Sequence, residues 1–452
     1  MGSKLLKFKC IFMKRVILFF LMLIAARTGF AGEISGFADG LLQDRTLRVD
    51  YIFSGTATEA EIALDAMSVS DGWFGRRHNL SEVPVEGNGQ ICMVDARSGR
   101  VLYRYSFSTL FQEWQSTEEA TMLRRSFENV FLLPMPSAEA VISIRLFDAK
   151  RRMSCEFSHK VNPEDILIRK TASRPAESKY IHQGGLPEDC IDVAIVAEGY
   201  TAAEKEMFYK DAAVAVNAIF SHAPFDNYKD RFNFVAVALE SEDSGVSVPL
   251  EGEWKNTAIS SHFSTFYMDR YLTTLNIKDL HDALSGVPYE HIIILANTET
   301  YGGGGIYNSY TLTTAHHPAF RPVVVHEFGH SFAALADEYY YDDMYSEYYY
   351  PGIEPWEQNI TTLADFDGHK WSGLLPARIT VPTPALKDIH SIWKEISDGA
   401  PMEKFIGIYE GAGYQSKGVY RAYPDCRMQT NKAEMFCPAC RKAVSEMIEF
   451  YI

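Results

Sequence analysis

Basic residues are outnumbered in this chain, which has 43 Lys and Arg against 59 Asp and Glu and a formal net charge of −16. A phosphate backbone would be repelled by such a protein, so the charge argues against nucleic acid as a partner. The composition, 47% hydrophobic and 23% charged, is that of a soluble globular protein and excludes large-scale disorder. A length of 452 residues exceeds one ordinary core and predicts two or three domains.

The apolar run near the N-terminus, residues 16–26, is too short to span a bilayer as a stable anchor. Lys14 and Arg15 precede this run, and residues 29–31 (GFA) provide small side chains for cleavage. The pattern predicts a signal peptide over residues 1–31 and export to the periplasm, the cell surface or the medium. After cleavage the protein is expected to have no stable membrane span.

Cysteine is sparse, and six of the seven cysteines would remain after cleavage: Cys92, Cys155, Cys190, Cys426, Cys437 and Cys440. An even count in an exported protein favours structural disulfides over metal thiolates. The pairing cannot be deduced from the sequence, but Cys92 and Cys155 would lie within the N-terminal domain and the other four cysteines within the second. The C-x-x-C at 437–440 lacks the second C-x-x-C that a zinc knuckle needs, so structural disulfides are the expectation here too.

Residues 32–160 alternate polar and apolar positions over short runs such as LRVDYIFSG and VISIRLFD. Such alternation, with turn residues in DARSGR, predicts an all-β sandwich domain whose role is scaffolding or substrate docking.

The polar, proline-bearing stretch 161–188 predicts a linker. From 189 to 452, strand patterns such as IDVAIVAE and EHIIILAN alternate with helical ones, and Thr201 with Glu204 predicts a capping box. This second domain is expected to be α/β with a mixed sheet.

Four consecutive glycines occupy residues 302–305, but the lysine of a phosphate-binding loop is missing. The glycines therefore indicate backbone that comes close to another part of the molecule or to substrate, and Gly304 is a candidate substrate contact. A flexible surface turn is the alternative. The following residues 306–314 (IYNSYTLTT) predict an exposed edge strand that a peptide could extend.

Residues 326–330 (HEFGH) form the H-E-x-x-H pattern. His326 and His330 lie one helical turn apart, with Cβ atoms about 5–6 Å apart, so that one zinc ion can bridge their rings. Glu327 is placed to act as general base on a water held by the metal. Three valines before the motif, residues 323–325, indicate that this active-site helix is buried, where unliganded charges would be costly.

A third acidic or imidazole ligand is missing from the position ten residues after the first histidine, which is Ala336. On an uninterrupted helix Asp337 would lie about 16 Å from His326, so the helix must end and the chain turn back between Ser331 and Ala336, without a glycine. Asp337 is the preferred third ligand on reach and acid chemistry, and Glu338 is the second candidate. The remaining candidates are later acids, namely Glu347, Glu354 and Glu357.

Several stretches together resemble the immunoglobulin A peptidase-type metallopeptidase family of the zincin superfamily. They are HEFGHSFAALADEYY, YGGGGIYN, EGYTAAE, the CRM at 426–428 and the CPAC tail, and the resemblance extends from about residue 35 to the C-terminus. It implies a metzincin-like zincin fold behind an N-terminal sandwich, and Zn²⁺ held by His326, His330 and an acid that maps onto Asp337. It also implies Glu327 as base and Met428 in a methionine turn below the metal. Read on its own, Met428 is equally well a core methionine.

An exported zinc-dependent endopeptidase acting on protein or peptide substrates is therefore the favoured hypothesis. Tyr339, Tyr340 or Tyr420 would donate a hydrogen bond to the developing oxyanion. The alternatives are a non-catalytic binding protein with a structural zinc, and a zinc hydrolase of a non-peptide bond. An intact Glu327 argues against a structural zinc, because a structural site has no use for a base.

Overall fold

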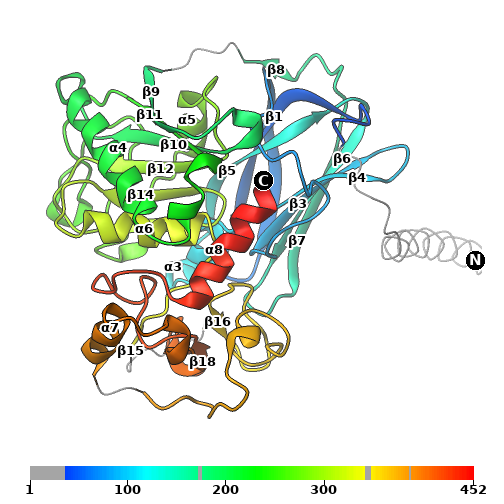
Figure 1. Cartoon of the computed structure of the whole chain (residues 1–452). Helices are drawn as coiled ribbons and strands as arrows, with labels where there is room; N and C mark the ends of the chain where they lie inside the picture. Colours follow the sequence, from blue (N-terminus) through cyan, green and yellow to red (C-terminus); the bar gives the residue numbers. More distant parts are fainter. Residues whose placement is uncertain (1–35, 172–175, 342–347, 386–387) are drawn as a thin grey trace, which may run out of the picture. The chain divides into compact units, whose positions relative to one another are not determined.

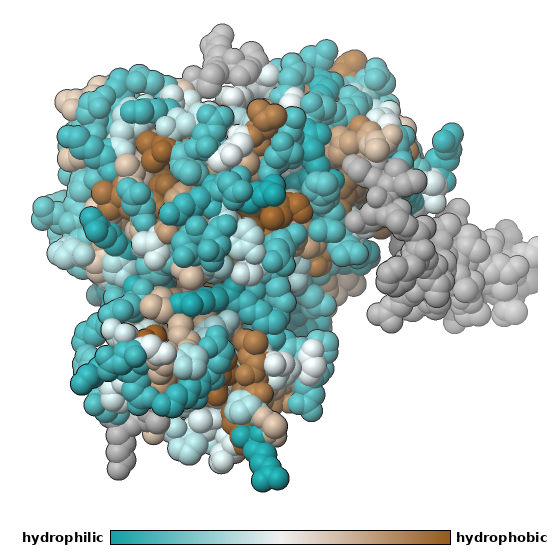
Figure 2. Space-filling model, viewed as in Figure 1, coloured by the Kyte–Doolittle hydropathy of each residue, from teal (hydrophilic) through white to brown (hydrophobic). Residues whose placement is uncertain are grey.

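The computed structural model describes residues 36–171, 176–341, 348–385 and 388–452. The predicted signal peptide lies outside these residues and stays a prediction. Among the residues described, no helix is both long and apolar enough to cross a membrane. On the face shown in Figure 2, hydrophilic residues predominate and hydrophobic residues form small separate groups.

The N-terminal part forms two four-stranded sheets (Figure 1). The first has the order β5 (Arg125–Pro136), β1 (Leu42–Gly55), β2 (Ala60–Asp71) and β8 (Arg169–Lys170). The second has the order β4 (Val101–Phe107), β3 (Gly89–Asp95), β6 (Ala140–Phe147) and β7 (Met153–Val161). Alternate residues of β3 and β6 are buried, and the Phe107 and Phe131 rings meet between the sheets with centroids 4.5 Å apart. The strands therefore pack as a sandwich.

A six-stranded mixed sheet carries the C-terminal half. Its order is β13 (Gly303–Ile306), β14 (Tyr310–Thr314), β12 (His291–Ala296), β10 (Ile191–Glu198), β11 (Phe232–Val237) and β9 (Ser178–Gln183). The four central strands run parallel, and β13 and β9 are antiparallel to their neighbours. Strands β10, β11, β12 and β14 are buried along their whole length, as apolar strands covered on both faces should be.

The two faces of this sheet belong to different cores. On one face of β10, Ile191, Val193 and Ile195 belong to the core that also contains residues of the helices α4 (Lys205–Phe220), α6 (Phe320–Ser331) and α8 (Pro438–Tyr451). Ala194 and Val196, on the opposite face, belong to the core that also contains the sandwich residues. Sandwich and sheet are thus packed together rather than separated by a free linker.

Two sequence expectations need correction. The segment 161–188, expected as a linker, contributes β8 to the sandwich and β9 to the mixed sheet. The second wrong expectation is the exposed edge strand at residues 306–314. Residues 310–314 of this segment form β14, which is buried between β12 and β13, and β13 is the outer strand. The glycine run is therefore the edge of the sheet.

The remaining elements are short or lie towards the C-terminus. A small sheet joins β15 (Tyr340–Tyr341), β18 (Tyr414–Arg421) and β16 (Ile360–Thr361), and β17 (Tyr409–Ala412) pairs with β18. The other α-helices are α2 (Leu110–Gln115), α3 (Glu119–Met122), α5 (Ile277–Ala283) and α7 (Ile389–Ser397). Short 3₁₀ turns occupy Pro187–Asp189, Ala202–Glu204, Phe225–Asn227, Lys229–Arg231, Pro249–Glu251, Thr265–Tyr267, Ser372–Leu374 and Met402–Phe405.

Candidate functional site

Helix α6 presents both motif histidines on one face. Its apolar side, including Val324, Val325 and Phe328, is buried against the mixed sheet and α4. The His326 and His330 side chains keep 13% and 15% of their surface exposed. Their Nε2 atoms lie 3.0 Å apart. The helix therefore holds two imidazole nitrogens at one point that solvent can reach.

After α6 the chain turns back through a residue that is not glycine. The helix ends at Ser331, and Ala334 takes a left-handed conformation with φ +55°. The Leu335 N–H then donates to the carbonyl of Gly329 at 3.1 Å. A left-handed alanine costs about 1–2 kcal/mol, which the buried surroundings of Ala334 must offset. The turn returns Asp337 to the histidines.

Asp337 is the acid that meets the histidine pair. Its Oδ1 lies 3.0 Å from the Nε2 of His326 and 3.2 Å from the Nε2 of His330. Glu338, the next residue, points instead to a group of cysteines.

The later candidate acids have other partners or are not described. Glu354 pairs with Lys370 at 2.6 Å, and Glu357 accepts a hydrogen bond from Tyr349 at 3.0 Å. Glu347 lies outside the described residues. Of the acids weighed as third ligand, the structure brings Asp337 to the pair.

The hydrogen bonds of the two rings fit a bound cation. The Nδ1–H of His326 donates to the carbonyl of Arg427 at 3.0 Å, and the Nδ1–H of His330 donates to that of Leu335 at 2.6 Å. A carbonyl only accepts, so each neutral ring turns an Nε2 lone pair towards the Asp337 carboxylate. Arms of about 2.0 Å in a tetrahedral zinc site set nitrogens about 3.3 Å apart. The nitrogen and oxygen donors, and the carbonyls that orient the rings, suit zinc.

The charges at the site are strongly coupled. Burial works to raise the pKa of Asp337, but the positive charge of His330 and His326 in their protonated form holds it well below its ordinary value. Burial raises the pKa of Glu327, and the attraction of the two imidazoles offsets part of this effect. Asp337 is therefore an anion facing the ring nitrogens, whereas Glu327 is a carboxylate that takes up a proton more readily than usual.

Glu327, on α6, faces β13, the strand that contains the glycines. Its carboxylate oxygen is within 4.8 Å of ring nitrogens of both histidines. A Cβ added to Gly303 would lie 2.8 Å from Glu327 Oε1, and one added to Gly305 would lie 2.3 Å from the Glu327 carbonyl oxygen. The glycines thus allow β13 to run directly against the helix. Gly304 faces the other way, towards the ring of Tyr271.

Met428 lies in a tight turn against α6. Gln429 and Thr430 donate backbone hydrogen bonds to the carbonyl of Cys426, which closes the turn. The Met428 side chain is fully buried, and its sulfur would lie 2.8 Å from a Cβ added to Gly329, inside the motif. Met428 is therefore a packed core methionine against the motif helix, and its assignment to a methionine turn stays a prediction.

The tyrosines differ in their distance from the site. Tyr339 lies nearly parallel to the His326 ring, with centroids 6.5 Å apart. Tyr340 is 39% exposed on β15. Tyr420 pairs with Thr361 and lies six residues, or about 20 Å of extended strand, beyond the start of β18. The structure brings Tyr339 to the histidine pair and leaves Tyr420 away from it.

Tyr414, at the start of β18, is a site residue that the sequence did not reveal. Its hydroxyl donates to Asp337 Oδ2, and its ring packs against Tyr339 with centroids 5.3 Å apart. Nothing in the sequence distinguishes Tyr414 among 25 tyrosines. It orients the carboxylate whose other oxygen faces the histidines.

Substituting Tyr414→Phe is expected to weaken zinc binding by about 10- to 100-fold, because the Asp337 carboxylate loses the donor that fixes its orientation. Zinc affinity would be measured by competition with a chromophoric chelator. Tyr420→Phe, on the same strand, is the matched control and should bind zinc as the unaltered chain does. Equal affinities for the two variants would contradict the positioning role of Tyr414.

The sandwich also reaches towards the site. Tyr271, which faces Gly304, donates a hydrogen bond to Glu113 on α2 of the sandwich part. Burial raises the pKa of Glu113 to about 7. No motif marked either residue, because they are 158 positions apart in the chain. Their contact links the sandwich to the glycine strand beside Glu327.

The expected disulfides are not formed in the structure, where all six cysteines are free. Cys92 and Cys155 lie on β3 and β7, which are separated by β6. Two strand spacings alone amount to about 9–10 Å, beyond the Cα separation of about 7 Å that a disulfide tolerates. The structure therefore does not allow a disulfide between Cys92 and Cys155. Cys426, Cys437 and Cys440 instead gather around Glu338.

Comparison with known families covers nearly all of the described chain. Residues 37–158 match the family Peptidase M64 N-terminus, and residues 180–399 and 393–448 match IgA Peptidase M64. The comparison with curated proteins gave no match. The peptidase match spans more than half of the chain and includes the motif helix, Asp337, Tyr414 and Met428. The chain therefore belongs to the IgA Peptidase M64 family, whose members are metallopeptidases.

Proposed function

We propose that the chain is an exported zinc-dependent endopeptidase with His326, His330 and Asp337 as zinc ligands and Glu327 as general base. The observation that carries this proposal is the convergence of three donor atoms, two Nε2 and one Oδ1, within 3.2 Å of one another. The two histidines donate their other ring hydrogens to backbone carbonyls, which leaves the converging nitrogens free to bind a metal.

The chemistry divides between the metal and the protein. A zinc ion at this point would lower the pKa of a coordinated water to about 7 and polarise the scissile carbonyl. Glu327 accepts the proton of the attacking water and delivers it to the leaving amine, which its raised pKa favours. Tyr339, beside the His326 ring, is the nearest of the expected tyrosines to donate a hydrogen bond to the oxyanion.

Strand β13 supports binding of an extended peptide. It is the outer strand of the mixed sheet and lies directly against Glu327. A backbone bridge from Tyr271 at Gly303 already occupies one end of this edge. A peptide substrate would pair with the part of β13 beyond Gly303, and its backbone would then lie beside the general base.

The two alternatives are less well supported. A structural zinc in a binding protein normally has four protein ligands and is closed to solvent, whereas His326 and His330 are each partly exposed beside a base. Membership in a peptidase family favours a peptide bond over a non-peptide bond as substrate.

Cleavage profiling of a proteome-derived peptide library tests the proposal. We expect cuts at internal peptide bonds that disappear after treatment with a chelator and return when zinc is added back. Magnesium is the matched control ion and should not restore activity, because it prefers oxygen ligands to imidazole. Cleavage that survives complete metal removal would exclude the zinc mechanism, and release of terminal residues only would exclude an endopeptidase.

A further inference from the structure

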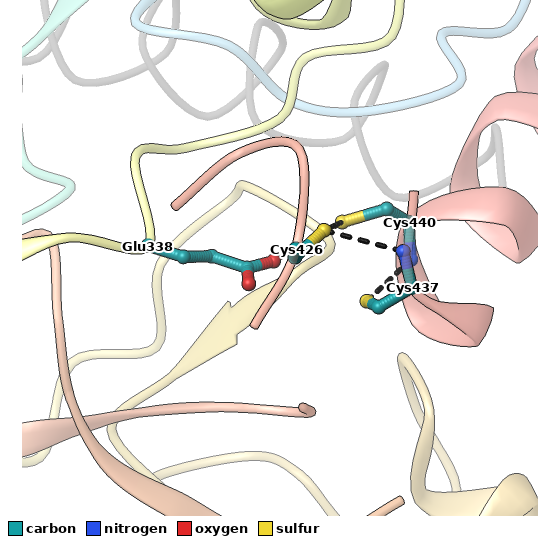
Figure 3. Close-up of side chains that lie close together, drawn as sticks. All are labelled: Glu338, Cys426, Cys437 and Cys440. Atoms are coloured by element: carbon teal, nitrogen blue, oxygen red, sulfur yellow. Dashed lines mark hydrogen bonds between the residues drawn. The ribbon is translucent and has the colours of Figure 1, made fainter. Parts of the chain in front are cut away.

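A second group of possible metal ligands lies apart from the histidine pair. Its members are Glu338, Cys426, Cys437 and Cys440, and Figure 3 shows the three sulfur atoms and the carboxylate turned towards one another. All four side chains are buried, and Glu338, Cys426, Cys437 and Cys440 each have 0% of their surface exposed. We propose that this group binds a structural zinc ion, distinct from the catalytic one.

The distances suit a tetrahedral zinc site. The Sγ atoms of Cys426 and Cys440 are 3.7 Å apart, and the Sγ of Cys440 is 3.1 Å from Glu338 Oε1. All four ligand atoms lie within 4.8 Å of one another. Zinc–sulfur bonds of about 2.3 Å place neighbouring sulfurs about 3.8 Å apart in a tetrahedron. Three thiolates and one carboxylate complete four-coordination and leave no open position, which is the pattern of a structural site.

The backbone around the cysteines stabilises thiolates. The N–H of Cys437 donates to the Sγ of Cys426 at 3.2 Å, and the N–H of Cys440 donates to the Sγ of Cys437 at 3.5 Å. Cys437 is also the N-cap of α8, a helix of 14 residues. Backbone donors and the positive end of a helix both favour the charged form of sulfur, which is the form that binds metals.

Glu338 points to a missing cation. Its Oε1 accepts from Asn359 at 3.0 Å, whereas its Oε2 is buried and has no hydrogen-bond partner. The guanidinium of Arg421 donates to the carbonyls of Glu410 and Gly411 rather than to this carboxylate. A buried carboxylate with an unpartnered oxygen is costly, and a metal ion bound at Oε1 among the three sulfurs would neutralise the charge of this carboxylate. A disulfide between two of the cysteines would leave both this buried charge and the third thiol unexplained.

The proposed ion would also brace the peptidase site. Glu338 follows Asp337 directly, and its N–H donates to the carbonyl of Met428 at 2.8 Å. Cys426 precedes Arg427, whose carbonyl orients His326. One ion therefore joins the segment that carries the third catalytic ligand to the methionine turn and to the start of α8.

Zinc analysis of the full chain carrying His326→Ala and His330→Ala tests the second site separately from the first. Because these substitutions remove the proposed catalytic ligands, we expect the zinc content to fall from two ions to one per chain. The remaining ion should be released by a mercurial that blocks thiols. Adding Cys437→Ser should abolish it, whereas adding Cys190→Ser, a buried cysteine outside the group, should leave one ion bound.

A second measurement covers the case in which Cys437→Ser does not fold. Glu338→Gln keeps all three thiols, and in the same His326→Ala, His330→Ala background it should lose zinc to a chelator at least about tenfold faster. Cobalt(II) in place of zinc should show thiolate charge-transfer absorption. A folded double-histidine variant without metal would overturn the proposal, as would a disulfide within the group in protein purified without reductant. If the unaltered chain bound a single zinc ion and the double-histidine variant kept that ion, the proposed function of the first site would instead be contradicted.

Discussion

Glu327→Gln is expected to lower kcat for peptide hydrolysis by about 10²- to 10⁴-fold, the usual contribution of a general base, while zinc stays bound. Glutamine keeps the shape of the side chain against Gly303 but cannot accept the proton of the attacking water. The proposed ligands His326, His330 and Asp337 are unchanged in this variant. Steady-state kinetics and zinc analysis of the same preparation would check both parts of the prediction.

Glu357→Gln is the matched control for this variant. Glu357 is also a buried glutamate, but its hydrogen bond goes to Tyr349 and it does not meet the histidine pair. Its substitution should leave kcat within a few-fold of the unaltered chain. If Glu327→Gln retained full turnover with zinc bound, Glu327 would not be the base and another group would have to accept the proton.

Asp337→Ala is expected to weaken zinc binding at the histidine pair by more than about 100-fold and to abolish hydrolysis at limiting zinc. Even the loss of a group that only orients a ligand costs 10- to 100-fold in affinity, and Asp337 is proposed to contact the metal itself. Removing its carboxylate also leaves the two Nε2 atoms, 3.0 Å apart, without the anion that faces them. Zinc titration and activity as a function of added zinc would measure the effect.

Asp211→Asn provides the comparison for Asp337→Ala. Asp211 likewise pairs with a histidine, His316, at 2.9 Å, and its carboxylate also accepts a hydrogen bond from Tyr200 rather than from a motif histidine. This variant should keep zinc affinity and activity. Unchanged zinc binding in Asp337→Ala would reject Asp337 as a ligand and return attention to another donor.

The sequence predicted the parts of the site that depend on local spacing. Two histidines four apart on a buried helix must share a face, and this alone brought His326 to His330. The reach of a straight helix showed that the chain had to turn before Asp337, and the left-handed Ala334 confirms that turn. The capping box of Thr201 and Glu204 is likewise present just before α4, because both of its hydrogen bonds are local.

The features that depend on contacts between distant segments could not be predicted. In the mixed sheet β13 lies outside β14, and the residues of these two strands do not indicate which of them is the outer one. The Tyr414–Asp337 contact joins residues 77 positions apart. The sandwich and the mixed sheet share a core because the opposite sides of β10 face different partners, which a continuous run of apolar residues does not show.

The cysteines illustrate the same limit in another way. Counting them predicted disulfides, and the lack of a second C-x-x-C argued against a zinc site. The structure brings Cys426 and Glu338, which is 102 positions away from Cys440, into one group with the C-x-x-C cysteines. Glu338 was weighed as a ligand for the histidine site, and it lies one residue from Asp337 but faces a different group.

Crystallographic anomalous scattering at the zinc absorption edge is the most direct test of zinc binding by His326, His330 and Asp337. We expect a peak within about 2.0–2.2 Å of His326 Nε2, His330 Nε2 and an Asp337 oxygen, with Glu327 beside it and not bound to it. A crystal of the zinc-reloaded protein with no peak at that point, in which Asp337 accepts hydrogen bonds from protonated histidines, would contradict it.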